Sequence, residues 1–263
     1  KQDASLSQDT ISIGGHGQTK EIIGRFLRNR AAVFGMVVVL FLLFCAIFPQ
    51  ALTQYDPIEQ NLRDRFAAPS AEHFFGTDEY GRDIFSRVIY GCRTSMEIGL
   101  ISVAISCIIG VVIGAIAGFY GGITDNLFMR FIDVLMAIPN TLLGISIVAA
   151  LGNSIPNLII ALSIGSIAGY ARVVRVSVLS TKGTEYVEAA YATGASDFRI
   201  IFKYILPNCL APIIVQATMS VATTIMAATG LSFLGLGVPA PTPEWGAMAS
   251  SSRAYIRDYW WLV

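Results

Sequence analysis

Long apolar runs alternate with short charged segments along this chain. The first run, 31–48, contains 18 residues without Asp, Glu, Lys or Arg and stops before Pro49. A helix of about 20 residues crosses the ~30 Å hydrocarbon core of a bilayer. The run therefore predicts a first transmembrane helix over 31–48, preceded by an N-terminal tail over 1–30.

Four further apolar stretches predict four more spans. We expect these over about 96–118, 130–151, 157–179 and 210–236. A turn near Gly152 separates two of them, and Pro139 is expected to kink the third span because proline lacks a backbone N–H. A sixth span would begin near Tyr259, so we expect a core domain over 96–263 and a sequence incomplete at both ends.

The segment 49–95 between the first two spans is polar and carries charges of both signs. Within it, apolar residues recur at helical spacing: Ile84, Phe85, Val88, Ile89 and Cys92. This pattern is typical of an amphipathic helix that lies on a membrane surface. We expect such an interfacial helix to lead into the second span.

Positive charge next to the first span indicates the orientation of the chain. Arg25, Arg28 and Arg30 precede the span, which favours a cytoplasmic N-terminus. Alternation of the spans then places 49–95 outside and a polar loop at 180–209 inside. A signal peptide is the rival interpretation, but 30 residues precede the apolar run and no small-residue cleavage site follows it.

The composition excludes several classes of protein. Hydrophobic residues make up 54% of the chain and charged residues 14%, against about 25% charge in a soluble domain. Lys plus Arg and Asp plus Glu number 18 each, so no net charge points to nucleic acid. Four scattered cysteines without a CxxC pair predict neither disulfides nor a zinc site. We therefore expect an all-α, multi-pass membrane protein.

Small residues recur every fourth position in the second predicted span. They are Ser102, Ser106, Gly110, Gly114 and Gly118. On a helix they form one narrow groove, where the backbone of another helix can approach closely. We interpret this stripe as a helix-packing face.

Motifs that would supply energy for transport are not found in this sequence. It has no GxxxxGK[ST] loop for phosphate, and its two histidines, His16 and His73, lie outside the predicted spans. Arg130 and Asp133 are spaced i,i+3, so we expect them to form a structural ion pair rather than a proton relay. We predict no catalytic residue, cofactor site or metal site in the chain, and a motor in another subunit.

One loop carries a recognisable motif. Its residues fall in the pattern EAA, three residues, Gly, and a later Leu-Pro: Glu188, Ala189, Ala190, Gly194, Leu206 and Pro207. This resembles the EAA loop of ABC importer permeases. The departure is Tyr204, which stands where that family has isoleucine, with Ile205 following it.

The residues of this loop, 180–209, suit it for docking to a soluble partner. Residues 185–192 predict a short helix whose alanines leave a shallow surface. Gly194 can adopt a positive φ and reverse the chain, and Ser196 or Asp197 can cap a second helix. An ordinary solvated loop of two short helices is the alternative.

Two further motifs sharpen the resemblance. The segment 76–95 resembles the GTDxxGRDxxSRxxYGxRxS signature of C-type permeases in dipeptide, oligopeptide and nickel importers. The segment 241–246, Pro-Thr-Pro-Glu-Trp-Gly, resembles the outer loop that precedes the last span in the same group. The resemblance extends from about Arg28 to the end of the chain.

The resemblance implies a fold, partners and a location. The fold would be that of a type I ABC importer permease, with six transmembrane helices of which five are complete here. The partners would be a second related permease, two cytoplasmic ATPase subunits that bind ATP and Mg, and an external solute-binding protein. The chain would lie in a bacterial cytoplasmic (inner) membrane, and peptides would pass between the two permeases.

Two alternatives remain open on the sequence. A nickel importer permease shares the motifs, although no His- or Cys-rich lining is visible in the spans. An ion-coupled carrier or a membrane enzyme that acts alone belongs to another class, which a requirement for ATPase subunits would exclude.

Overall fold

The computed structural model describes residue 24 and residues 26–262. Most of the tail predicted over 1–30, including Arg25 and His16, lies outside the described residues. The chain divides into two units, the first ending at Phe44 and the second beginning at Cys45. The first unit contains most of α2 (Arg30–Ile47), an apolar helix of 18 residues. This helix occupies nearly the whole of the first predicted span.

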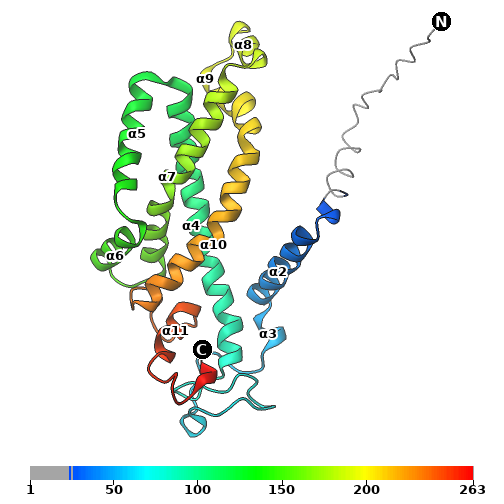
Figure 1. Cartoon of the computed structure of the whole chain (residues 1–263), viewed down its shortest axis with the longest axis vertical. Helices are drawn as coiled ribbons and strands as arrows, with labels where there is room; N and C mark the ends of the chain where they lie inside the picture. The colour runs from blue at the N-terminus through cyan, green and yellow to red at the C-terminus, as the bar shows by residue number, and fades with distance from the viewer. Residues whose placement is uncertain (1–23, 25, 263) are drawn as a thin grey trace, which may run out of the picture. The chain divides into compact units, whose positions relative to one another are not determined.

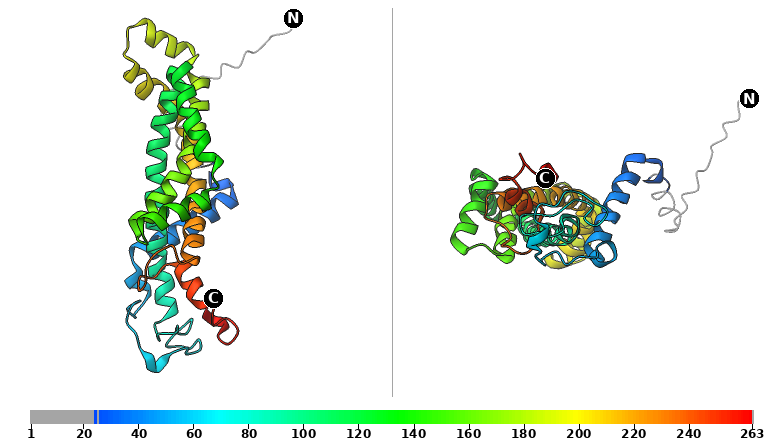
Figure 2. Two further views of the ribbon diagram at one scale, coloured as in Figure 1. Left: turned by 90° about the vertical axis from the view of Figure 1, so that its left-hand side faces the viewer. Right: turned by 90° about the horizontal axis from the view of Figure 1, so that it is seen from below.

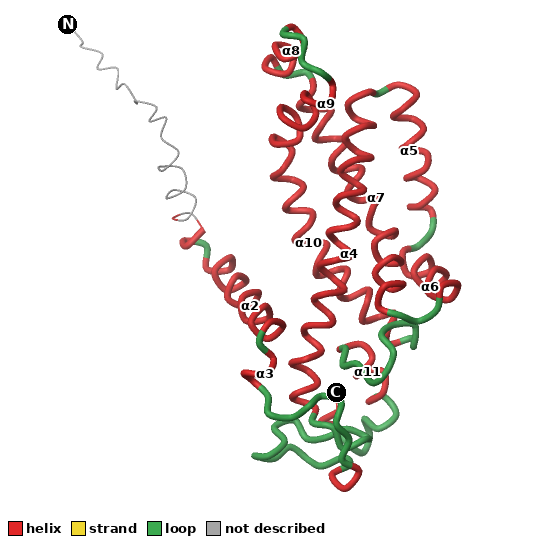
Figure 3. Tube along the Cα trace, turned by 180° about the vertical axis from the view of Figure 1, so that it is seen from behind, coloured by secondary structure: helices red, strands yellow, loops and turns green. Residues whose placement is uncertain are grey.

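Helices dominate the second unit, and the described residues contain no strand beyond one isolated bridge (Figure 3). The long helices are α4 (Ile84–Tyr120), α5 (Gly122–Ala137), α6 (Asn140–Leu151), α7 (Ile155–Lys182) and α10 (Leu210–Phe233). The short helices are α3 (Pro49–Leu52), α8 (Glu185–Ala192), α9 (Asp197–Arg199) and α11 (Trp245–Ser252). A π-helix spans Ile200–Ile205, and 3₁₀ turns span Leu62–Asp64, Leu206–Cys209 and Trp260–Leu262.

The second predicted span belongs to a longer helix than we expected. The predicted interfacial helix and the span at 96–118 form one continuous helix, α4, of 37 residues. At 1.5 Å per residue this helix is about 55 Å long, which exceeds the thickness of a hydrocarbon core. No proline interrupts it, so the amphipathic segment continues the span rather than turning away from it.

The third predicted span is broken rather than kinked. Helices α5 and α6 meet at Ile138 and Pro139 and are bent by 87°. Because Pro139 provides no backbone N–H, the helical hydrogen bonds of α5 cannot continue through it. Helix α5 also begins at Gly122, before the start near residue 130 that we expected for the third span.

Helices α4, α7 and α10 form the centre of the second unit (Figures 1 and 2). The contact between α4 and α7 is the most extensive between any two helices of this unit. Among the described residues, four helices are long and apolar enough to cross a membrane, or five if α5 and α6 count as one span. The chain is therefore an all-α membrane protein.

The second unit has two distinct ends. Helices α8 and α9 lie at one end, and α11 lies at the other with the loops of residues 53–83 (Figure 1). We call these the α8 end and the α11 end. The motif of residues 188–207 belongs to the first, and the motifs of residues 76–95 and 241–246 belong to the second.

Candidate functional site

Helix α8 is fixed to the long helices through one apolar face. Val187 is fully buried and Ala190 is 5% exposed. Both belong to a core cluster that also contains Phe119 of α4 and Val174 and Val178 of α7. Movement of α4 or α7 would therefore carry α8 along, since a packed core transmits displacement.

The opposite face of α8 is open. Glu188 and Ala189 are exposed, as are Glu185 and Tyr186 on the same helix. Of the two motif alanines, Ala190 thus packs inward, while Ala189 leaves the surface beside Glu188 shallow. Two carboxylates in the first turn also suit the positive end of a helix.

Gly194 ends α8 with a Schellman turn. Its φ is +74°, and its backbone N–H donates to the carbonyl of Tyr191 at 2.9 Å. The N–H of Ala195 donates to the carbonyl of Ala190 at 3.1 Å, which completes the motif. A Cβ at Gly194 would meet nothing within 4 Å, so backbone conformation and not space requires glycine here.

An aromatic contact further fixes the α8 end. The rings of Tyr191 and Phe119 stack with centroids 6.2 Å apart and planes 17° apart. Lys182, the last residue of α7, donates to the carbonyl of Phe119 and lies over its ring. Burial, and then the nearby carboxylate of Asp197, raise the pKa of Tyr191 above its ordinary value.

The second half of the motif leads back into the bundle through a π-helix. Ile205 is fully buried, whereas Tyr204 is half-buried against the same core cluster as α8. Leu206 packs against that cluster too, and Pro207 is exposed. Ile205 thus provides the buried apolar side chain, and Tyr204 adds a partly exposed aromatic beside it.

The polar part of the small-residue stripe of α4 bonds to α7. Ser106 donates to the carbonyl of Ser163 at 3.0 Å, and Ser102 donates to the carbonyl of Ile159 at 3.4 Å. In return Ser163 donates to the carbonyl of Ser102 at 3.3 Å. All three serines are buried, and their hydroxyls find acceptors on the facing backbone.

The glycine part of the stripe allows the two backbones to approach. A Cβ at Gly110 would lie 2.4 Å from Cβ of Tyr170, and one at Gly114 would lie 2.4 Å from the carbonyl oxygen of Ala171. A Cβ at Gly118 would lie 3.0 Å from the carbonyl oxygen of Arg175. No larger residue fits at Gly114 without displacement of α7, because backbone atoms cannot rotate away.

The ion pair predicted between Arg130 and Asp133 is wrong. Asp133 of α5 instead accepts from Arg172 of α7 at 2.6 Å. A second pair joins the same helices, with two bonds of 2.5 and 2.6 Å from Arg175 to Asp125. The long arginine side chains of α7 reach the neighbouring helix, and Arg130 lies exposed on α5.

A buried carboxylate organises the α11 end. Asp78 accepts from the backbone N–H groups of Tyr80 at 2.9 Å and Arg82 at 3.0 Å, and from Nε of Arg82 at 2.7 Å. Arg87 of α4 approaches it at 3.5 Å and donates to the carbonyl of Pro57 at 2.7 Å. The charged residues of this motif therefore fold the loop onto α4.

Other residues of the same motif shape the turn and begin α4. Gly81 has a φ of +73°, and a Cβ there would lie 1.7 Å from the carbonyl oxygen of Asn61. Asp83 caps α4 by accepting from the N–H of Ser86 at 2.7 Å. Its other oxygen lies 2.9 Å from Nδ1 of His73. Among the described residues, no three His, Cys, Asp or Glu side chains gather as a metal site.

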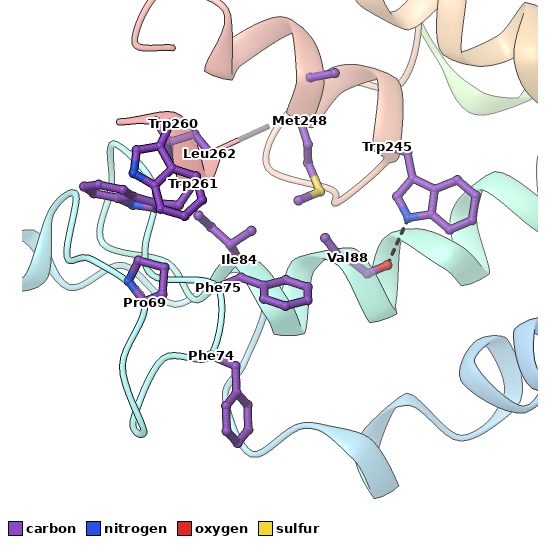
Figure 4. A pocket seen from close by; sticks show the side chains of 11 residues that line it. Pro69, Phe74, Phe75, Ile84, Val88, Trp245, Met248, Trp260, Trp261 and Leu262 are labelled. Carbon is purple, nitrogen blue, oxygen red and sulfur yellow. Dashed lines mark hydrogen bonds between the residues drawn. The ribbon is translucent and has the colours of Figure 1, made fainter. Parts of the chain in front are cut away.

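The Pro-Thr-Pro-Glu-Trp-Gly segment attaches α11 to α4. Glu244 is fully buried and accepts from the N–H groups of Gly246 at 3.0 Å and Ala247 at 2.8 Å. Trp245 donates from Nε1 to the carbonyl of Val88 at 3.0 Å (Figure 4). This glutamate is thus a helix cap, and the tryptophan joins two elements far apart in sequence.

An apolar pocket of about 540 Å³ lies at this end, between the start of α4, α11 and the final turn. Trp245, Met248, Trp260 and Trp261 lie around it with Phe75 (Figure 4). Tryptophan is common at membrane–water interfaces. Trp245 of the segment 241–246 and the two tryptophans of the final turn thus line one pocket.

Two parts of the chain match known protein families. Residues 110–256 match the family described as binding-protein-dependent transport system inner membrane component. Residues 17–69 match the N-terminal transmembrane domain of oligopeptide transport permease C. The first match covers α7, α8 and α10, and therefore both the stripe's partner helix and the loop of residues 188–207.

Curated relatives agree with these families. The dipeptide transport system permease protein DppC of Alkalihalophilus pseudofirmus is 45% identical over 244 residues, which are 93% of this chain and 80% of that protein. The di/tripeptide permease DppC of Pseudomonas aeruginosa is 44% identical over 93% of this chain and 82% of its own. The oligopeptide permease OppC of Bacillus subtilis is 40% identical over 93% and 80%.

A solved structure shares the fold. The inward-facing MetNI methionine ABC transporter matches with a TM-score of 0.56 at 18% identity, over 67% of this chain and 84% of the matched one. The apolar helices, the family matches and these relatives agree on a multi-pass membrane protein. The chain belongs to the binding-protein-dependent family of ABC importer permeases, in the group that includes the DppC and OppC proteins.

Proposed function

We propose that this chain is a transmembrane subunit of an ATP-driven importer for di- or oligopeptides. It forms the translocation path with a second, related permease and receives peptide from an external binding protein. Two cytoplasmic ATPase subunits bind and hydrolyse ATP, and this chain carries no catalytic residue. Relatives named as dipeptide, di/tripeptide and oligopeptide permeases support peptide as the substrate class.

The geometry of α8 supports coupling to the ATPases. Its inner face is locked to α4 and α7 through Val187 and Ala190, while Glu188 and Ala189 remain exposed. A rigid knob of this kind can seat in a groove of a soluble partner and transmit its motion to the attached spans. Gly194 sets the angle at which the second half of the loop leaves α8.

The experiment is uptake of labelled peptide and ATPase rate for the complete transporter in reconstituted vesicles. We expect Gly194→Val and Glu188→Arg to insert and assemble normally but to lose most uptake. The ATPase activity stimulated by binding protein and peptide falls in parallel, because the loop with a changed conformation or charge no longer fits the ATPase subunit. Ala192→Ser, on an exposed position of the same helix, is the matched control.

Three outcomes separate the alternatives. Wild-type uptake and ATPase rates in both variants would show that α8 does not couple the spans to ATP. Uptake of radiolabelled nickel in place of peptide would assign the substrate to the metal. Uptake without any ATPase subunit, driven by an ion gradient, would overturn the importer assignment altogether.

A further inference from the structure

The break between α5 and α6 leaves the first turn of α6 beside a small cavity. The cavity measures about 120 Å³ and lies between α6, α7 and α10. Its polar lining residues are Asn140, Thr141, Ser166, Thr223 and Thr224. The other lining residues are apolar or glycine, and none carries a charge. We call this space the break cavity.

The break cavity lies within the apolar part of the bundle. Ser166 stands near the middle of α7, and Thr224 stands near the middle of α10. Helix α7 is long and apolar enough to span a membrane, and so is the helical stretch Asp197–Phe233 that ends with α10. Polar side chains at this depth are costly and mark functional sites or water-filled paths, so their convergence on one cavity requires a reason.

The hydroxyl of Thr224 has no partner. Thr224 is 4% exposed, and within the described part of the chain its side chain forms no hydrogen bond. A threonine in a helix usually bonds to a carbonyl one turn earlier, as Thr218 of the same helix does at 3.1 Å from Ile214. Thr224 is therefore a largely buried residue that lines the cavity, and its hydroxyl is free to donate to a ligand there.

The start of α6 adds further donors. Helix α6 has 12 residues, and Pro139 before it supplies no side-chain cap. The backbone N–H groups of its first turn have no partners inside the helix. They also carry the partial positive charge of the helix end, which attracts an anion or a carbonyl oxygen. Asn140 and Thr141 of this turn line the break cavity.

Resting on the proposed peptide import, we propose that the break cavity binds the C-terminal carboxylate of a peptide in transit. The N–H groups of the first turn of α6 and the hydroxyl of Thr224 donate to its oxygens. Every linear peptide with a free C-terminus carries this carboxylate, so the site is independent of peptide side chains. Broken helices in transporters hold substrate carboxylates in the same way.

Size and charge agree with this ligand. A volume of about 120 Å³ suits a carboxylate and its Cα better than a large side chain. Because the lining carries no lysine or arginine, the carboxylate is held by neutral donors alone. Such a site binds weakly enough to release a substrate that has to move on.

The test compares peptide acids with peptide amides. The complete transporter, with its binding protein, is reconstituted and supplied with alanine di- to pentapeptides bearing either a free carboxylate or a C-terminal amide. We expect Thr224→Val to slow uptake of the acids about tenfold, the effect of one lost hydrogen bond to a charged group, and to slow the amides much less. Thr224→Ser restores the wild-type ratio.

Thr218→Val is the matched control, because Thr218 lies on the same helix and its hydroxyl is satisfied by its own backbone. The binding protein is identical in every assay, so a changed acid-to-amide ratio originates in the permease. A wild-type ratio in Thr224→Val overturns the inference. So does a lowered melting temperature with the ratio unchanged, which would assign the hydroxyl a purely structural role.

Failure of the proposed function is distinguishable from failure of this inference. If the wild-type complex takes up no alanine peptide, acid or amide, and binding protein with peptide does not stimulate its ATPase, peptide import itself is overturned. If wild-type uptake is robust and Thr224→Val handles acids and amides as the wild type does, only the carboxylate site is overturned.

Discussion

Arg175 on α7 donates two hydrogen bonds to Asp125 on α5, at 2.5 and 2.6 Å. The two residues are 50 positions apart, and the planar guanidinium matches both carboxylate oxygens. Together with the pair of Arg172 and Asp133, this contact joins α5 to α7 at two points. The α5 helix is thus held by charge as well as by apolar packing.

These two ion pairs should differ in strength. The side chains of Arg175 and Asp125 are 30% and 15% exposed, whereas those of Arg172 and Asp133 are 48% and 52% exposed. We expect Asp125→Asn to destabilise the purified complex by about 1.5–3 kcal/mol and Asp133→Asn by less than about 1 kcal/mol. Thermal unfolding in detergent measures both, and equal losses would contradict the ranking.

The apolar runs predicted the long helices because a segment inside the hydrocarbon core has to satisfy its backbone hydrogen bonds internally, and a helix does so. The contacts between the helices were harder to predict. Arg130 and Asp133 have the spacing of a helical pair, yet Asp133 bonds to Arg172. Only the packing of α5 against α7 brings that arginine within reach, and no local spacing encodes a contact over 39 residues.

In the candidate sites, too, local features could be predicted and contacts between distant residues could not. The motif of Glu188 and Gly194 is local, so the sequence could predict its helix and its turn. The break cavity was not predicted, because Thr224 has no unusual neighbours in sequence. Pro139 was the one available signal, and its interpretation as a kink missed that the break turns the start of α6 toward α7 and α10.

The contact of α4 with α7 should tolerate no added carbon at its tightest point. A Cβ at Gly114 would lie 2.4 Å from a carbonyl oxygen, whereas one at Gly169, on the facing helix, would lie 3.6 Å from its nearest neighbour. We expect Gly114→Ala to lower the melting temperature of the complex clearly and Gly169→Ala to leave it nearly unchanged. Equal melting of the two variants would show that the stripe is not a packed interface.

The cap of α11 should contribute strongly to the α11 end. Glu244 is fully buried and accepts two backbone hydrogen bonds. We expect Glu244→Ala to cost about 2 kcal/mol, near the upper limit for loss of a helix cap, and Glu244→Gln to cost less because one acceptor remains. Limited proteolysis around residues 237–258 measures the opening of this segment. Cleavage at the wild-type rate in Glu244→Ala would contradict a capping role.

Backbone conformation, not crowding, should decide which residues function at position 194. The φ of Gly194 is +74°, and no atom lies within 4 Å of a built Cβ, so a side chain has room but meets torsional strain. Asparagine adopts this conformation more readily than alanine, and valine adopts it least. We therefore expect stimulated ATPase activity to fall in the order Gly194, Gly194→Asn, Gly194→Ala, Gly194→Val. If the loss followed side-chain volume instead, with Asn worse than Ala, the knob would be limited by space at the partner surface. The conformational role of Gly194 would then be refuted.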